Sequence, residues 1–441
     1  MPAPPDRPSG TVEHYNAFVL ANWKRNLWLH VADGVFYSVG IALAQPETIL
    51  PGFIRDTAEV AGLSAWANRL VGLLPLVMVS CFIMPQLLTA KLAEGRALLK
   101  GPLLLFALLE RLPWLFMGAV TAMVTRGHPV AAIYLFMGLM FVYQFDIGLV
   151  YPVWQEFVAK TIPVRRRGLL FGIREGIGGV LGFVVLLVGS PLVARLAYPA
   201  NYGALFAGCF VALMISYTPL FFLKEAPAPI ERVSRSMRDH FTGLWSVVRA
   251  DGALKRYLLC RCVQGVSMVA APSFFAMRAV SVLGAAEAAM LTVKLAMVTM
   301  LARAASSLLV GPLGDRVGYR VVLAGGSFVS AAAITTALLA QSVWGFYLAY
   351  ALATISHMSF WLGRGNYVLE LAPLERRPSY VSIDHLVGLP FVAAPFFGGW
   401  MADSFSYTLP FAAGIILALA AGVMFASTAD PRRTMRSDIV A

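Results

Sequence analysis

Ionisable side chains recur inside otherwise apolar stretches of this sequence. Asp33 lies in the first long apolar run, Asp146 lies in the fourth, and Asp384 lies near the end of the chain. A carboxylate or imidazole that alternates between wet and dry surroundings, or between paired and unpaired states, changes its pKa and can carry a proton. The predicted proton-coupling residues are Asp33, Asp146, Glu175, Asp384 and His385. The alternative interpretation for each is a static ion pair that holds helices together.

Basic and aromatic side chains share the same stretches. An ionisable group deep in hydrocarbon costs at least about 2.5–3.5 kcal/mol, so it persists mainly where it faces a cavity or a partner. The excess of cations favours an anionic ligand, and aromatic rings can stack on a planar one or serve as packing and interfacial anchors. The predicted cavity residues are His30, Arg69, Tyr143, Arg174, Arg261, Phe274, Lys294, Arg303, His357, Trp361 and Arg364.

Other polar residues in apolar runs favour structural roles. Glu110 and Arg111 are adjacent and opposite in charge, so they are expected to neutralise each other or to bind a neighbouring helix. The four cysteines show no metal-ligand spacing. The sequence contains no H-x-x-x-x-D acyltransferase motif, no H-E-x-x-H and no G-x-S-x-G, which argues against an enzyme. It also contains no P-loop, so the driving energy is expected to come from a gradient. We expect no cofactor and no metal, and an intramembrane enzyme stays as an alternative.

The composition requires lipid as the solvent for much of the chain. Of 441 residues, 59% are hydrophobic and 13% charged, against about 45–50% and 25% in soluble domains. Runs such as Leu103–Leu109 and Val180–Val188 are apolar on every side, which excludes a transmembrane barrel and leaves helices. The net charge of +12 is typical of loops that face anionic lipid, so no nucleic-acid partner is expected.

Apolar runs between Gly, Pro and charged residues predict the membrane-spanning elements. They form an all-α integral membrane protein of twelve transmembrane helices in two pseudo-symmetric six-helix bundles. Residues 1–26 and 429–441 are predicted tails, 27–223 and 255–428 the two bundles, and 224–254 a central loop whose amphipathic helix lies on the membrane surface. The predicted helices are 27–49, 65–89, 101–124, 130–154, 168–194, 201–223, 255–279, 288–312, 320–340, 343–368, 379–402 and 407–428.

The basic residues are distributed unevenly over the two sides of the membrane. Only Arg55, Arg126, Arg195 and Arg278 fall in loops on one side, whereas most of the others fall in the tails and the opposite loops. By the positive-inside rule both termini are cytoplasmic. The first apolar run has no small-residue cleavage site, so no removable signal peptide is expected. We predict a multi-pass protein of the plasma membrane, in bacteria the inner membrane.

The two halves of the sequence repeat. A shift of 210 residues pairs Pro163–Arg167 with Pro373–Arg377 and also pairs glycines further along. Duplicated bundles around a central site are typical of transporters. The same shift gives Arg174 and Glu175 the positions of Asp384 and His385, so we expect acids and bases to meet across the interface between the bundles.

One loop carries a family signature. Residues 311–323 read GPLGDRVGYRVVL, which resembles the G-x-L-x-D-R-x-G-R-K-x-x-L signature of the Major Facilitator Superfamily. The resemblance implies a cytoplasmic gate in which Asp315 is the acid, Arg316 and Arg320 are the bases, and Gly311 and Gly318 permit close packing. It also implies that helices 3, 6, 9 and 12 are peripheral. The corresponding loop near residue 90 lacks the carboxylate, so one of the two gates is expected to be missing or rebuilt.

These features together predict a secondary active transporter that works by alternating access. Its partners are expected to be a small-molecule substrate, protons and the lipid bilayer, and it is expected to function as a monomer. The substrate is predicted to be a small organic anion or a metallophore-like compound. The alternatives are a proton-coupled exporter of amphipathic drugs and a transport-inactive membrane sensor or scaffold on the same fold.

Overall fold

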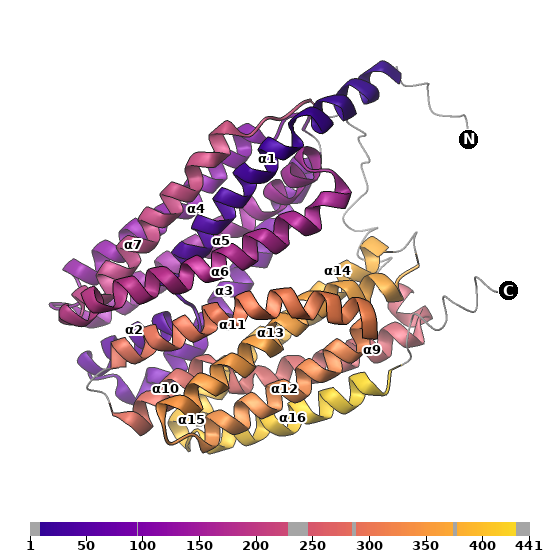
Figure 1. Ribbon diagram of the computed structural model, residues 1–441. Coiled ribbons are helices and arrows are strands. Elements are labelled where there is room, and N and C mark those ends of the chain that lie inside the picture. The colour runs from indigo at the N-terminus through magenta and orange to yellow at the C-terminus, as the bar shows by residue number, and fades with distance from the viewer. Residues whose placement is uncertain (1–8, 95, 228–245, 285–287, 374–376, 429–441) are drawn as a thin grey trace.

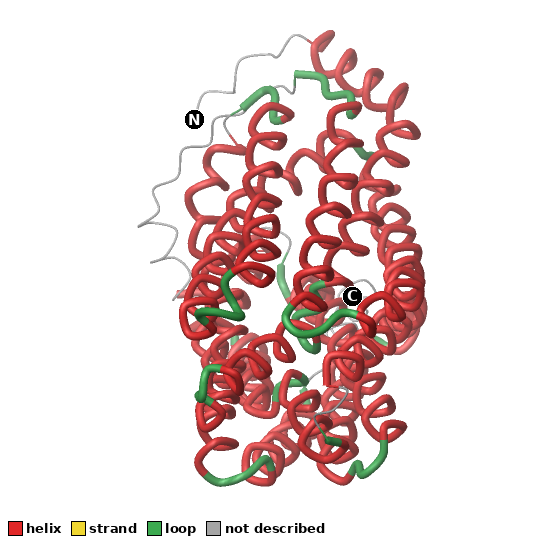
Figure 2. The backbone as a smooth tube through the Cα atoms, turned by 90° about the vertical axis from the view of Figure 1, so that its left-hand side faces the viewer, coloured by secondary structure: helices red, strands yellow, loops and turns green. Residues whose placement is uncertain are grey.

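The computed structural model describes residues 9–94, 96–227, 246–284, 288–373 and 377–428. All regular elements in these ranges are helices (Figures 1 and 2). The first half contains α1 (Ser9–Leu43), α2 (Ile49–Val60), the 3-10 turn η1 (Ser64–Trp66), α3 (Ala67–Glu94), α4 (Lys100–Met123), α5 (Pro129–Thr161), α6 (Val164–Arg195), α7 (Ala200–Tyr217) and the 3-10 turn η2 (Thr218–Phe222).

The second half repeats this pattern with two interrupted helices. It contains α9 (Gly252–Ser267), η3 (Met268–Ala270), α10 (Ser273–Leu283), α11 (Ala288–Val317), α12 (Tyr319–Leu339), α13 (Val343–Leu371), α14 (Arg377–Gly388), η5 (Leu389–Ala393), α15 (Ala394–Ser404) and α16 (Thr408–Ala426). The turn η3 divides the seventh expected span and η5 divides the eleventh. The two interrupted helices touch, because a Cβ on Gly398 would lie 1.9 Å from the carbonyl oxygen of Val269.

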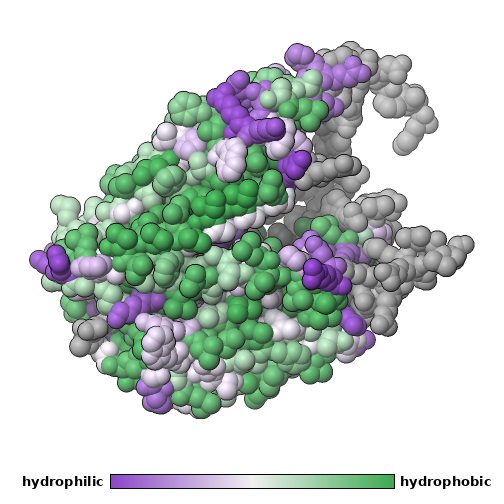
Figure 3. Space-filling view, in the orientation of Figure 1, coloured by the Kyte–Doolittle hydropathy of each residue, from purple (hydrophilic) through white to green (hydrophobic). Residues whose placement is uncertain are grey.

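Ten of the expected spans are long and apolar enough to cross a membrane. The two remaining ones correspond to α1 and α13, which have 35 and 29 residues and exceed the roughly 20 that a bilayer requires. The chain is therefore a multi-pass, all-helical membrane protein, and the full count of twelve stays a prediction. Figure 3 agrees with this assignment, because apolar residues cover the middle of the visible face and hydrophilic ones gather at its ends.

Several boundaries differ from the sequence-based expectation. The first helix begins at Ser9 rather than 27, because no proline lies between Pro8 and Pro46, and it ends at Leu43 rather than 49, ahead of Pro46. The helix α2 was not expected at all: its 12 residues are too few to span a bilayer, yet Phe53 and Ile54 on its apolar face are fully buried. The predicted amphipathic helix of the central loop lies mostly outside the described residues.

Short polar signals set several helix ends. Asp251 caps α9 by accepting hydrogen bonds from the amides of Ala253 and Leu254 at 2.8 and 3.0 Å. The α11–α12 turn needs Gly318, whose φ is +92°, a conformation that residues with a Cβ rarely adopt. The tight turn at Gly318 makes α11 and α12 antiparallel neighbours.

The helices form two groups that are joined along two seams (Figure 1). The elements α1 to α7 make the first group and α9 to α16 the second; α6 packs against α11, and α3 packs against α15. We call the end where α1 begins and α16 ends the terminal end, and the opposite end, near α2, the distal end. The groups diverge toward the terminal end in Figure 1.

Candidate functional site

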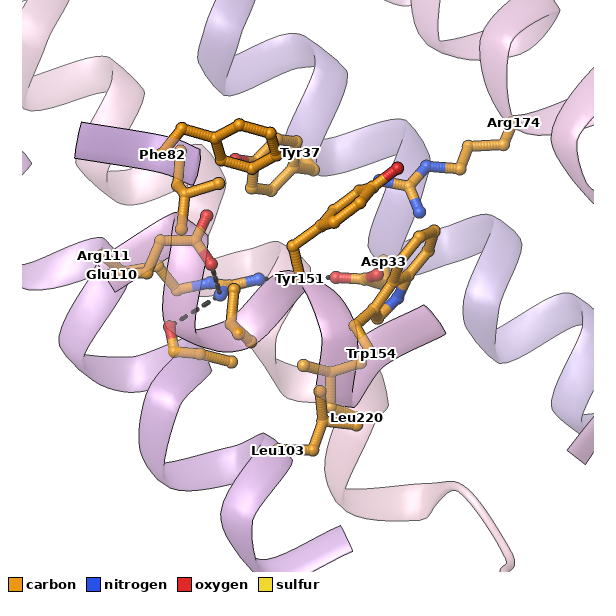
Figure 4. A pocket seen from close by; sticks show the side chains of 13 residues that line it. Asp33, Tyr37, Phe82, Leu103, Glu110, Arg111, Tyr151, Trp154, Arg174 and Leu220 are labelled. Atoms are coloured by element: carbon orange, nitrogen blue, oxygen red, sulfur yellow. Dashed lines mark hydrogen bonds and ion pairs between the residues drawn. The ribbon is translucent and has the colours of Figure 1, made fainter. Parts of the chain in front are cut away.

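A pocket of about 260 Å³ lies inside the first group of helices (Figure 4). Side chains from α1, α3, α4, α5, α6 and η2 line it. Its acidic part is formed by Asp33 and Glu110 on either side of Arg111, and its basic part by Arg174. Four aromatic rings form much of the wall between these two parts: Tyr37, Phe82, Tyr151 and Trp154.

Arg111 is the centre of the buried charge cluster in this pocket. Its guanidinium lies 3.4 Å from the Asp33 carboxylate and 3.5 Å from that of Glu110. It also donates to Ser216 at 3.0 Å, and Ser216 donates to Asp33 at 2.8 Å. Further donation to the carbonyl oxygens of Leu213 and Ala107 occupies the rest of the guanidinium. The cluster thus joins α1, α4 and α7.

The expectation that Glu110 and Arg111 pair with each other or bind a neighbouring helix is confirmed. Arg111 binds Glu110 and also neighbouring helices, where Asp33 shares the same guanidinium. Both side chains are buried and line a pocket, although the family resemblance makes their helix peripheral. The sequence contained a signal for this site, an acid and a base at the centre of an apolar run, and we read it as structural.

Arg174 on α6 carries a guanidinium atom that has no hydrogen-bond partner within the described ranges. Its guanidinium lies over the ring of Trp154 at 4.8 Å and near the ring of Tyr37 at 6.0 Å. Its Nη1 atom is buried and has no hydrogen-bond partner among the described residues. The side chain passes directly over Gly34, where a Cβ would lie 2.1 Å from the arginine. Glycine at position 34 is therefore what allows Arg174 to reach the pocket.

Two predicted cavity residues of the first group belong to its packing. His30 is fully buried, and its Nε2 atom lies 3.2 Å from the hydroxyl of Thr161. The hydroxyl of Tyr143 lies 3.3 Å from that of Tyr37, and its ring packs edge-on against Trp114. Tyr143 therefore contacts Tyr37, which lines the pocket, and does not line the pocket itself.

A second charge cluster lies in the second group of helices. The Asp384 carboxylate on α14 lies 3.3 Å from Arg261 on α9 and 3.2 Å from Arg364 on α13. It also accepts a hydrogen bond from the hydroxyl of Tyr257 at 2.7 Å. One buried carboxylate thus serves two guanidinium groups, and the cluster ties α9, α13 and α14 together.

An ion pair between α6 and α11 joins the two groups of helices. Glu175 on α6 and Arg303 on α11 lie 2.9 Å apart, with both side chains partly exposed. The expectation that the equivalent positions of both repeats pair across the interface is therefore wrong for Asp384, which pairs inside its own group. The side chain of His385 lies outside the described part of the structure.

Arg69 belongs to a contact at the distal end rather than to a cavity. It lies 3.6 Å from Asp403 and donates to the Ser404 hydroxyl at 3.0 Å. Asp403, at the end of α15, also accepts hydrogen bonds from the amides of Asn68 and Arg69 and from the Asn68 side chain. An acid of the second group thus satisfies free amides at the start of α3 in the first group. We call this contact the distal latch, formed by Asn68, Arg69, Asp403 and Ser404.

The remaining predicted residues are placed separately. Asp146 and Lys294 are half-buried, and neither forms an ion pair within the described residues. His357 and Trp361 on α13 are exposed, whereas Phe274 on α10 is fully buried in the core. The structure therefore gathers the candidates into two clusters and one bridging pair rather than into one site. Phe274 is a packing residue.

The signature loop packs differently from what the resemblance implies. Asp315 accepts a hydrogen bond from the Tyr319 hydroxyl at 2.8 Å, and Arg320 donates to the carbonyl oxygen of Thr428 at 2.7 Å. A Cβ on Gly311 would meet open space, whereas one on Gly314 would lie 2.3 Å from the Tyr319 ring. Close packing thus requires Gly314 and Gly318, and not Gly311. Arg316 is exposed.

The two ends of the molecule differ in how the groups meet. At the distal end, the latch is reinforced by α2, where a Cβ on Gly52 would lie 2.8 Å from Thr292 of α11. Toward the terminal end, Gly168 and Gly172 of α6 have no neighbouring atom near a Cβ, and Leu308 and Leu309 of α11 are exposed. The described helices are closed at the distal end and apart at the terminal end.

Comparisons with known proteins agree with a membrane carrier. The sequence profile of the Major Facilitator Superfamily matches residues 279–438, and no curated protein matches the sequence. The chain is similar in structure to a D-xylose-proton symporter (13% identity, 92% of this chain and 97% of that chain covered, TM-score 0.64). It is also similar to the nucleoside transporter NupG (12%, 90% and 100%, 0.65) and to the human organic anion transporter MFSD10 (12%, 91% and 99%, 0.60).

The fold and the profile match agree on one class of protein. A nearly all-helical chain with ten candidate spans has the fold of solved secondary transporters. Residues 279–438, in its second half, match the profile of the Major Facilitator Superfamily. The family and the similar structures are transporters and not enzymes.

Proposed function

We propose that this protein is a secondary active transporter for a small organic anion that carries a carboxylate. The observation that carries the proposal is Arg174, a partly buried cation that lines a pocket with aromatic walls and whose buried Nη1 atom has no hydrogen-bond partner among the described residues. A carboxylate is the natural partner for a guanidinium in such a site. The similar structures include one described as an organic anion transporter.

The route between the two sides is proposed to be alternating access. The distal latch and α2 close one end, and the helices stand apart at the other. The distribution of basic residues supports a cytoplasmic terminal end, so the structure would be open to the cytoplasm.

A proton is the proposed coupling ion. One similar structure is described as a proton symporter, and the half-buried Asp146 of α5 has no ion-pair partner among the residues described. Asp146 can therefore exchange a proton without breaking an ion pair, unlike Glu175 or Asp384. Asp146→Asn is expected to abolish gradient-driven accumulation and to spare exchange. Undiminished accumulation in this variant would remove Asp146 from the mechanism.

Transport is tested with purified protein in proteoliposomes. The probes are radiolabelled monocarboxylates of different size, with a hydrophobic cation for comparison. We expect saturable uptake of a carboxylate that Arg174→Gln reduces at least tenfold and Arg195→Gln, a control at the exposed end of the same helix, leaves intact. Saturable movement of the hydrophobic cation alone would instead identify an exporter of amphipathic drugs. Binding without any movement would identify a sensor or scaffold.

A further inference from the structure

We propose that the pocket in the first group of helices binds a zwitterion, with its carboxylate at Arg174 and its protonated amine at Glu110. This inference rests on the proposed function and narrows its substrate class from organic anions to compounds that carry both charges. Figure 4 shows the two ends of the pocket, with Arg174 on one side and Glu110 beside Arg111 on the other. The net charge at each end of the pocket determines which charged group of a ligand can bind there.

The acidic end of the pocket carries more negative than positive charge. Asp33 and Glu110 both approach Arg111, the only cation within 4.0 Å of either carboxylate in the described residues. All three side chains are at least 95% buried, so the excess negative charge is poorly compensated by water. A buried charge without a partner costs several kcal/mol. The cluster is therefore expected to gain from one additional positive charge in the pocket.

Glu110 is the acid that can receive this charge. Asp33 is already bound by both Arg111 and Ser216. Glu110 has only one contact to Arg111, at 3.5 Å, and a hydrogen bond from the Tyr37 hydroxyl. A carboxylate has room for more donors than these two, and an ammonium group supplies three.

The wall of the pocket suits a cation as well. The rings of Tyr37, Phe82, Tyr151 and Trp154 line the space between the two charged ends. Aromatic faces attract ammonium groups through the ring quadrupole, and Trp is the strongest of them. At about 260 Å³ the pocket is below the roughly 300–1,000 Å³ of drug-sized sites, so it fits a small amino acid rather than a large amphipathic compound.

The basic end of the pocket receives the carboxylate. The Nη1 atom of Arg174 is buried and has no hydrogen-bond partner in the part of the chain that the structure describes, and the ring of Trp154 lies against the guanidinium at 4.8 Å. The ring contact fixes the plane of the guanidinium, which leaves its N–H groups to bind an oxygen anion in that plane. An ω-amino carboxylate thus complements both ends of the pocket.

The competing occupant of the acidic end is a proton. Protonation of Glu110 would also balance the cluster, and the groups that face Glu110 are Asp33 and Tyr37 of α1, Arg111 of α4, Tyr143 and Asp146 of α5, and Cys209 of α7. In that case the pocket would take a plain anion together with a proton. The two occupants are distinguished by whether a ligand amine improves binding.

The test is isothermal titration calorimetry on the purified full chain in detergent. The probes 6-aminohexanoate, hexanoate and hexylamine share one carbon chain and differ only in their charged ends. We expect 6-aminohexanoate to bind at least tenfold more tightly than either single-charge compound. Glu110→Gln should weaken 6-aminohexanoate about tenfold and leave hexanoate unchanged, whereas Arg174→Gln should weaken both carboxylates.

Matched variants and pH decide between the outcomes. Glu59→Gln, an exposed acid on α2, is the control and should change none of the affinities. The proposal is overturned if hexanoate binds as tightly as 6-aminohexanoate and its affinity rises as the pH falls from 8 to 6. A preference for 6-aminohexanoate without uptake in proteoliposomes would contradict the transporter function and leave the binding site standing.

Discussion

The two charge clusters are near mirror images of each other in composition. In the first group of helices one guanidinium, Arg111, lies between two carboxylates, and it is 3% exposed. In the second group one carboxylate, Asp384, lies between two guanidinium groups, Arg261 and Arg364, which are 13% and 27% exposed. The first cluster is thus acidic and sealed, and the second is basic and partly open to solvent.

This difference shows that the repeat preserves the helices and not the chemistry. Two bundles of the same design carry clusters of opposite net charge. Removing one charge should therefore destabilise the two clusters to different extents. A buried charge that loses its partner cannot be compensated by water, whereas an exposed one can.

Removal of Arg111 is expected to have the largest effect. Arg111→Gln leaves Asp33 and Glu110 buried without a cation, so the free energy of unfolding should fall by about 3–5 kcal/mol. Thermal unfolding in detergent measures this loss. The triple variant with Asp33→Asn and Glu110→Gln removes the charges as well and should recover most of it. Equal instability of the single and triple variants would show that packing, and not charge balance, decides the effect.

Removal of Asp384 is expected to have a smaller effect. Asp384→Asn leaves Arg261 and Arg364 without their carboxylate, but both are partly exposed, so water compensates them and the cost should be about 1–3 kcal/mol. The same unfolding assay measures it, with Glu59→Gln as a control. A loss as large as that of Arg111→Gln would contradict the contrast between a sealed cluster and an open one.

The ion pair between Glu175 and Arg303 should contribute little to stability. Glu175 and Arg303 are 30% and 39% exposed, and ion pairs of this kind contribute at most about 1 kcal/mol. Glu175→Gln is therefore expected to leave the unfolding midpoint almost unchanged in dilute and in concentrated salt. A large, salt-dependent decrease would show that this pair holds the two groups together.

Removal of Glu110 is expected to have the smallest effect on the free energy of unfolding, and it is the one change that can raise it. Glu110→Gln deletes the uncompensated negative charge and leaves Arg111 balanced by Asp33, so stability should stay within about 1 kcal/mol of the original or rise. The comparison with Arg111→Gln is direct, because the two positions are adjacent and equally buried. A strong loss of stability would mean that Glu110 is required as a partner of Arg111.

Much of the fold could be predicted from hydropathy alone. Ten expected spans are present, because hydrocarbon requires about 20 apolar residues in each of them. The helix α2 was not predicted, because its 12 residues are too few to be recognised as a membrane span. The start of α1 at Ser9 was also not predicted, because a polar segment can continue a helix that the membrane has already nucleated.

The candidate site was predictable in its members and not in its pairings. The rule that charges in apolar runs face partners or cavities found Asp33, Arg174 and Asp384. It could not show that Arg111 of a different helix would be the partner of Asp33, since pairing depends on how the helices are rotated. Asp403 was missed because it stands near a predicted helix end, where an acid is ordinary.

Alternating access is the central claim, and a reversible lock on the distal latch tests it most directly. The side chains of Asn68 and Asp403 are in hydrogen-bond contact at 2.8 Å, so Asn68→Cys with Asp403→Cys, in a Cys262→Ser background, can be joined by a disulfide or a short bifunctional thiol reagent. We predict that proteoliposome uptake stops when the link forms, that ligand binding persists, and that reduction restores uptake. Uptake at an unchanged rate with the link complete would contradict the account.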